Sequence, residues 1–201
     1  MLFGVISFFA FFFTILYAIG FVANLVVPKG IDDGLPIDIM PTILINSLML
    51  GLFAVQHTIM ARPGFKNWWT KIVPDPIERS IFVLVTSLIL LLTFWQWRPM
   101  PTYVWKLNHP IADNALHAIS FIGWAIVFYS TFLINHFDLF GLRQVVLYFQ
   151  GKDYTHSPFR TPSLYRFVRN PHMLGFLIAF WATPAMSQGH LLFSGLTTAY
   201  I

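Results

Sequence analysis

Three polar residues occur together where a long apolar stretch ends, in STFLINHFDLFGLRQV, residues 130–145. Asn135, His136 and Asp138 bring together an amide, an imidazole and a carboxylate. A histidine can accept a proton near neutral pH, and a carboxylate can fix which of its ring nitrogens carries the proton. Because side chains two apart on a helix point to different faces, Asp138 reaches His136 only if the helix ends first. The alternative is a plain helix end, where polar residues meet water and Gly141 closes the turn.

A second polar group precedes the last apolar stretch, in the segment YRFVRNPHMLGF, residues 165–176. Asn170 is a residue type that caps helices, and Pro171 suits the first helical position, so the pair predicts a helix start. Arg166 and Arg169 would then lie at a membrane surface, where they can contact lipid headgroups. Spacing alone favours this explanation, which needs no ligand.

The same segment also offers groups that could hold a charged ligand. A proline beside a helix start leaves backbone groups without helical partners, and these groups can bond a ligand. The two arginines could hold a carboxylate through charge-assisted hydrogen bonds. Gly175, four residues after the proline, would let a ligand approach the helix backbone closely.

The chain contains seven histidines, and no two of them are three or four positions apart. This spacing excludes the His-x-x-x-His pattern of helical zinc sites and of membrane di-iron centres. It leaves open a haem held by histidines from two helices, such as His57 and His136. For each histidine the plain alternative is a polar residue that is hydrogen-bonded locally. An ionisable side chain inside a membrane span is nevertheless a functional candidate.

The composition is that of a membrane protein. Of the 201 residues, 57% are hydrophobic and only 10% are charged, whereas soluble domains carry about 25% charged residues. The 22 phenylalanines and seven tryptophans suit a lipid-facing surface with interfacial aromatic belts. There is no cysteine, so disulfides, thiolate metal sites and a cysteine nucleophile are excluded. The chain has no basic run with interleaved aromatic residues, so we expect no nucleic-acid partner.

Uncharged windows predict an all-α fold, a polytopic membrane helical bundle. A spanning helix takes about 20 residues, so a chain of this length holds five or six spans. The last window is divided at Pro184, and only the 11 residues 191–201 remain for a final span. We therefore expect five full spans plus a truncated sixth, in a single integral membrane domain, 1–201, whose C-terminal part is missing. The expected windows are 1–28, 39–61, 80–97, 114–137, about 171–186, and a sixth that begins near His190.

The distribution of basic residues predicts the orientation. Nine of the twelve lysines and arginines fall in two loops, 62–79 and 138–169. The positive-inside rule makes these loops cytoplasmic, and the N-terminus is then cytoplasmic as well. The first 28 residues carry no charge and lack the basic region and cleavage site of a signal peptide, so we expect a retained first span.

The sequence resembles the isoprenylcysteine carboxyl methyltransferase-like membrane proteins, which include the NnrU-type proteins, and among them the methanethiol S-methyltransferase branch. Residues 169–175, Arg-Asn-Pro-x-x-x-Gly, are similar to the Arg-His-Pro-x-Tyr-x-Gly segment of that superfamily. Asn170 replaces its histidine and Met173 its tyrosine. The other matching blocks are FAVQHTIMARPGFKNWW (53–69), ERSIFVL (78–84), FWQWRP (94–99), STFLINHFDLFGLRQV (130–145) and the rest of 165–193.

The resemblance implies a bacterial inner-membrane enzyme that binds S-adenosylmethionine from the cytoplasmic side and methylates methanethiol to dimethyl sulfide. Its partners would be a small thiol substrate and the lipid bilayer. Members of the superfamily carry a Glu-containing segment after the last helix that helps to enclose the cofactor, and a chain that ends at Ile201 can lack activity for that reason. By position, the cofactor-binding residues would be Arg166, Arg169, Asn170, Pro171, His172 and Gly175.

The chemistry needs few catalytic groups. A sulfonium donor needs no acid, and a thiolate that attacks it cancels two opposite charges, so a dry apolar site favours the reaction. The protein must align the reacting atoms and help to remove the thiol proton, for which His136, Asp138 and His57 are the candidates. Alternatives are another lipophilic thiol or a prenylcysteine carboxylate as acceptor, or a non-catalytic NnrU-like or haem-binding protein.

Overall fold

The computed structural model describes residues 1–35, 37–155 and 163–201. Within these residues four helices are long and apolar enough to cross a membrane. They are α1 (Leu2–Ala23), α2 (Ile39–Ala61), α4 (Asp75–Gln96) and α5 (Pro110–Ile134). The four corresponding windows predicted from the sequence are confirmed, and the second has the same bounds as α2.

The predicted fifth full span is not confirmed. Residues 171–186 instead form a short helix, α8 (Pro171–Trp181), followed by the strand β2 (Ala185–Ser187). At 1.5 Å per residue, 11 residues cover about half of a bilayer core. The helix stops because Pro184 follows and because β2 pairs antiparallel with β1 (Tyr103–Lys106). A further helix, α9 (Gln188–Tyr200), begins close to the predicted position.

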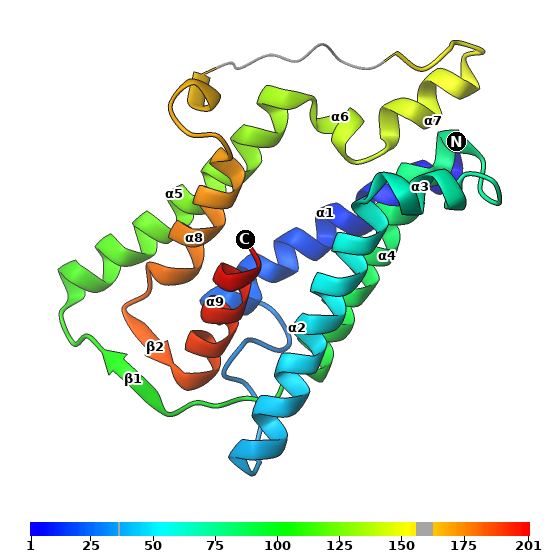
Figure 1. Cartoon of the computed structure of the whole chain (residues 1–201). Helices are drawn as coiled ribbons and strands as arrows, with labels where there is room; N and C mark the ends of the chain where they lie inside the picture. The colour runs from blue at the N-terminus through cyan, green and yellow to red at the C-terminus, as the bar shows by residue number, and fades with distance from the viewer. Residues whose placement is uncertain (36, 156–162) are drawn as a thin grey trace.

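The helices form two groups (Figure 1). One group is α1, α2 and α4, in which α4 packs against both of the others. The other is α5 with α8, which lie side by side along most of α8. The last helix, α9, packs against α2 of the first group and α8 of the second, so it connects the two groups.

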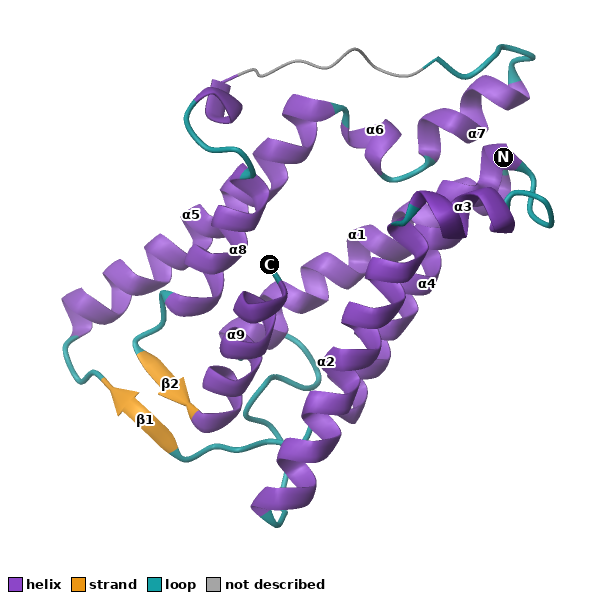
Figure 2. Ribbon diagram, in the orientation of Figure 1, coloured by secondary structure: helices purple, strands orange, loops and turns teal. Residues whose placement is uncertain are grey.

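The described parts of the two basic loops lie at one end of the molecule, together with the N-terminus (Figure 2). This end carries the short helices α3 (Pro63–Trp69), α6 (His136–Leu139), α7 (Leu142–Phe149) and the 3₁₀ turn Ser163–Arg166. We call it the charged end, and the opposite end carries the β1–β2 pair. His156, one of the seven histidines, and Arg160, one of the basic residues of the loop 138–169, lie outside the described residues.

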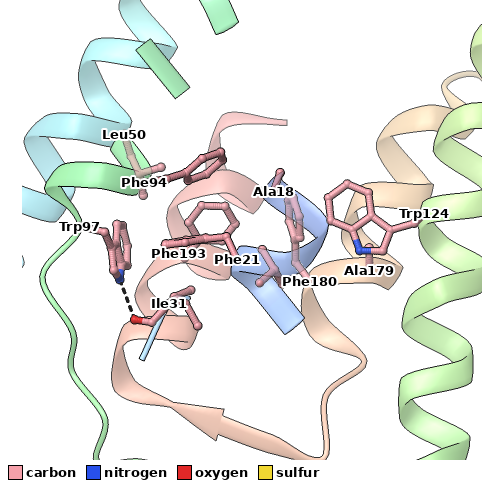
Figure 3. Packing of buried hydrophobic residues seen from close by; sticks show 11 residues of the cluster. Ala18, Phe21, Ile31, Leu50, Phe94, Trp97, Trp124, Ala179, Phe180 and Phe193 are labelled. Carbon is pink, nitrogen blue, oxygen red and sulfur yellow. Dashed lines mark hydrogen bonds between the residues drawn. The ribbon is translucent and has the colours of Figure 1, made fainter. Parts of the chain in front are cut away.

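The main hydrophobic core lies away from the charged end and draws on both helix groups (Figure 3). Phe21 of α1 contacts Phe94 of α4 at a ring-centroid distance of 4.7 Å, and Phe193 of α9 packs edge-on against Phe21 and Trp97. The buried Trp97 donates its indole N–H to the Ile31 carbonyl at 3.1 Å, so its one polar atom is satisfied. This packing holds the two groups together beneath the charged end.

Candidate functional site

The corner of the charged end is formed where α5 stops and the chain turns twice. Asn135 follows α5, and its side-chain Oδ1 accepts a hydrogen bond from the Asp138 amide at 3.2 Å. Gly141 then takes a φ of +83°, and an added Cβ would lie 2.8 Å from the amide nitrogen of Ser80. Since both the angle and the close approach need glycine, the turn into α7 packs directly on α4. Arg79 strengthens this contact by donating from Nε to the Leu139 carbonyl at 2.7 Å.

Between this turn and the start of α4 lies a cavity of about 660 Å³, which we call the corner cavity. It is lined by charges of both signs, Lys66, Arg79, Lys152, Asp75, Glu78, Asp138 and Asp153. Within the described parts of the chain, Glu78 Oε1 and Gln144 Oε1 are buried and have no hydrogen-bond partner. A buried acceptor without a donor costs about 1–3 kcal/mol, so these two oxygens favour a ligand that supplies N–H or O–H groups.

Among the described residues, Arg143, Tyr154 and Gln144 contact Asp138 at this cavity. Its Oδ2 lies 3.5 Å from Arg143 Nη1 and accepts a hydrogen bond from the Tyr154 hydroxyl at 3.3 Å. Gln144 donates to the Asp138 backbone carbonyl at 3.1 Å. Burial, followed by the hydrogen bond to Asp138, raises the pKa of Tyr154, so this hydroxyl stays protonated and remains a donor. The result is an oriented carboxylate at the cavity wall.

His136 is two residues away but faces an aromatic cluster instead of the cavity. Its ring is stacked on Phe132 at 4.2 Å and meets Phe8, Phe137 and Phe140 edge-on. Its Nδ1 lies 2.8 Å from the Thr131 hydroxyl. The suggestion that Asp138 fixes the tautomer of this histidine is therefore wrong, because the two side chains leave a one-turn helix on different sides. Burial lowers the pKa of His136, which keeps the ring neutral at neutral pH.

His57, on α2, lies apart from His136. Its ring packs against Phe53 at 5.4 Å and Phe82 at 4.9 Å, and Tyr200 of α9 stands edge-on at 6.5 Å. In the described part of the chain no ring contact joins the two histidines. His57 contacts Phe82 and His136 contacts Phe140, and these two phenylalanines belong to one hydrophobic cluster. Over the same residues, no three histidine, aspartate or glutamate side chains form a metal site.

The start of α8 lies beside α5, toward the charged end. Asn170 is the N-cap and Pro171 the first helical residue, as predicted, although the Asn170 side chain makes no capping hydrogen bond. Arg166, Arg169 and Asn170 are exposed, and His172 is half-buried. The preceding 3₁₀ turn is held to α5 by the contact of Ser163 Oγ with the Tyr129 hydroxyl at 3.3 Å. None of the predicted cofactor-binding residues lines the corner cavity.

Gly175 has a clear packing role. A Cβ added to it would lie 2.7 Å from the carbonyl oxygen of Gly123 and 2.9 Å from the amide nitrogen of Val127. A Cβ on Gly123 would in turn lie 2.5 Å from the amide nitrogen of Ala179. The close approach that the sequence suggested does occur at Gly175, but the partner is the backbone of α5.

Several cavity residues were not singled out from the sequence. Glu78 and Gln144 belong only to matching blocks, Arg79 belongs to a matching block and a basic loop, and Tyr154 belongs to no motif considered above. The available signal was the pair Glu78-Arg79 at the start of an uncharged window, since charges at that position lie where a span meets the membrane surface.

Comparison with known proteins gives several close relatives. The chain is 56% identical over 200 residues to Methanethiol S-methyltransferase 1 of Bradyrhizobium diazoefficiens, a match that covers 100% of this chain and 70% of that protein. It is 51% identical to Methanethiol S-methyltransferase of Mycobacterium tuberculosis, which covers 100% of this chain and 82% of the relative. Nurim of Xenopus laevis is more distant, at 29% identity over 76% of this chain and 56% of that protein. No family model and no solved structure matches.

Proposed function

The chain belongs to the methanethiol S-methyltransferase family, and from this premise we propose that it transfers a methyl group to methanethiol and releases dimethyl sulfide. The observation that carries the proposal is the similarity itself. Five relatives of that name are 43% to 56% identical to this chain over its whole length. The apolar helices suit the substrate, because methanethiol and dimethyl sulfide are small, apolar and soluble in lipid.

We propose S-adenosylmethionine as the methyl donor, bound at the charged end. This molecule carries a sulfonium, an ammonium and a carboxylate, and the corner cavity offers charges of both signs. The buried oxygens of Glu78 and Gln144 suit its ammonium and hydroxyl groups. Asp138 would face the cationic part, and Arg166 and Arg169 at the start of α8 would hold the carboxylate. The remaining contacts would come from Asn170 and His172 beside them.

When bound, this donor supplies an electrophilic methyl group. The protein's tasks are to keep water away, to align the acceptor sulfur and to take the thiol proton. We propose that His136 accepts the thiol proton, because its neutral ring lies among phenyl groups that a lipid-dissolved thiol can reach. Asp138 lies beside Arg143 and Tyr154, and we propose that it orients the donor. His57 is the less favoured base, since it lies on α2 among Phe53, Phe82 and Tyr200.

We propose that the protein is an integral protein of the bacterial inner membrane, with the charged end and the N-terminus in the cytoplasm. Most of the basic residues lie at that end, which the positive-inside rule assigns to the cytoplasm. S-adenosylmethionine, a charged molecule, would enter from that side. In this arrangement α8 and α9 are the fifth and sixth membrane segments of a single domain.

The test uses membranes that contain the protein, methanethiol and S-adenosylmethionine with a deuterated methyl group. Headspace mass spectrometry should detect dimethyl sulfide that carries one deuterated methyl group. Control membranes without the protein set the background, and product at background level would refute the proposal. A competition series with longer thiols and a prenylcysteine then tests whether another acceptor is preferred.

A further inference from the structure

The hydroxyl of Thr131 has two close neighbours but only one proton. Its Oγ1 lies 2.7 Å from the carbonyl oxygen of Phe128 and 2.8 Å from His136 Nδ1. A carbonyl oxygen can only accept, so the Thr131 proton must point to Phe128. If that proton pointed to Nδ1 instead, two acceptor oxygens would face each other at 2.7 Å with no hydrogen between them. Nδ1 is therefore the donor, and it carries the ring proton of the neutral histidine.

The other ring nitrogen, Nε2, is then the one with the lone pair. Among the described residues His136 makes a hydrogen bond only through Nδ1, so no protein group occupies the Nε2 lone pair. His136 is 6% exposed as a residue, and phenyl groups surround its ring, one stacked at 4.2 Å and three edge-on. Phenyl rings neither accept nor donate a proton. Nε2 is thus a basic atom in an apolar enclosure.

The enclosure opens toward the surface that a lipid-dissolved thiol would approach. Phe132 is 59% exposed and Phe137 is 49% exposed, and both touch the His136 ring. The neighbours Asn135 and Asp138 line the corner cavity on the other side. His136 therefore lies between an apolar approach for the acceptor and the charged cavity.

We propose that Thr131 is a positioning residue, which holds His136 in the Nδ1–H tautomer so that Nε2 receives the proton of methanethiol. The inference rests on the proposed function. The S–H bond breaks as the Nε2–H bond forms, and the sulfur lone pair makes the new bond to the methyl carbon. The electron pair of the old carbon–sulfur bond returns to the sulfonium sulfur of the donor. The imidazolium that results carries one proton on each nitrogen and releases the Nε2 proton to solvent before the next turnover.

The first test is spectroscopic and needs no activity. Nitrogen NMR of the purified protein labelled with ¹⁵N-histidine distinguishes the two neutral tautomers, and the His136→Gln variant identifies the His136 signals. We expect the Nδ1–H tautomer in the wild type and in Thr131→Ser, which keeps the hydroxyl. Thr131→Val should give a mixture or the Nε2–H form. A wild-type signal of the Nε2–H tautomer would overturn the proposal.

The second test is kinetic. Thr131→Val should lower kcat about tenfold, by analogy with the loss of a group that orients a metal-bound histidine, and leave the KM for the donor unchanged. Thr131→Ser should restore most of kcat. Thr14→Val is the matched control, because Thr14 is also buried and also donates to a helix carbonyl, that of Ala10 at 2.7 Å, but touches no histidine. An unchanged kcat in Thr131→Val would refute the positioning role. If the wild type made no dimethyl sulfide, the proposed function would fail, and the NMR result would still decide the tautomer.

Discussion

Alanine at Gly123 or Gly175 should weaken the contact between α5 and α8. The nearest atoms that a new Cβ would meet at Gly123 are all backbone atoms of α8, at 2.5 to 3.0 Å. At Gly175 they are the Gly123 carbonyl, the Val127 amide and one methyl group of Val127, at 2.7 to 2.9 Å. Ordinary contacts of a Cβ begin near 3.4 Å. Because backbone atoms cannot rotate away, the helices must separate by several tenths of an ångström.

The size of the effect follows from two opposing terms. Forcing extra volume into a packed contact costs about 1–3 kcal/mol. Replacing a helical glycine by alanine returns about 0.5–1 kcal/mol through backbone entropy. We expect a net loss of about 1–2 kcal/mol for Gly123→Ala, whose contacts are the closest, and somewhat less for Gly175→Ala. Gly51→Ala is the matched control, because Gly51 is helical and a Cβ there meets nothing within 4 Å. This control should gain stability.

The assay is equilibrium unfolding in mixed detergent micelles without donor, followed by the fluorescence of the seven tryptophans. The packing account predicts that Gly123→Ala and Gly175→Ala unfold more easily than Gly51→Ala. It would be refuted if Gly175→Ala were as stable as Gly51→Ala while its affinity for S-adenosylmethionine fell. That outcome would indicate that Gly175 contacts the cofactor, as the sequence suggested.

Three further substitutions test the charged end and the opposite loop. Glu78→Gln should raise the KM for S-adenosylmethionine about tenfold, since a hydrogen bond to a charged acceptor is lost, and an unchanged KM would count against the donor's position. Asp138→Asn should lower kcat/KM at least about tenfold in the methyl-transfer assay, because it removes the carboxylate beside Arg143. Asp38 is exposed at the other end of the molecule, so the control Asp38→Asn should leave kcat/KM unchanged. Burial raises the pKa of Asp32 in the folded protein above its value in the unfolded chain. Between these two pKa values the unfolded chain loses this proton first, so the free energy of unfolding falls as pH rises. Thermal unfolding at pH ~3 to ~7 should show this loss in the wild type and not in Asp32→Asn; equal pH dependence would contradict it.

The long helices were predictable because charge marks their limits. The window 39–61 coincides with α2, since Asp38 precedes it and Arg62 follows it. The end of the chain was harder to predict, because composition does not distinguish a full span from a short helix and a strand that share one apolar window. There the deciding contact is β1 with β2, a pairing between segments about 80 residues apart in the chain, which no local pattern specifies.

The candidate site was predictable in part. The residue types at 135–138 predict a polar turn after the span, and α5 does end there. The suggested partner of His136 was wrong, because a hydrogen bond to Thr131 depends on how the end of α5 bends. Gly175 was interpreted as a site of ligand approach, but the group that approaches it is the backbone of α5. The sequence does not distinguish a glycine that contacts a ligand from one that contacts a neighbouring helix. Glu78 was overlooked because a charge near a span end is equally well explained by membrane orientation.

The position of the donor tests the central claim most directly. A structure of the protein with S-adenosylhomocysteine, the demethylated donor, would locate the sulfur from which the methyl group leaves. We predict that this sulfur lies at the charged end, between Asp138 and the start of α8, on the side from which a thiol can reach His136. A ligand bound instead at the opposite end, in the cavity of about 160 Å³ beside Asp32 and His190, would contradict the account.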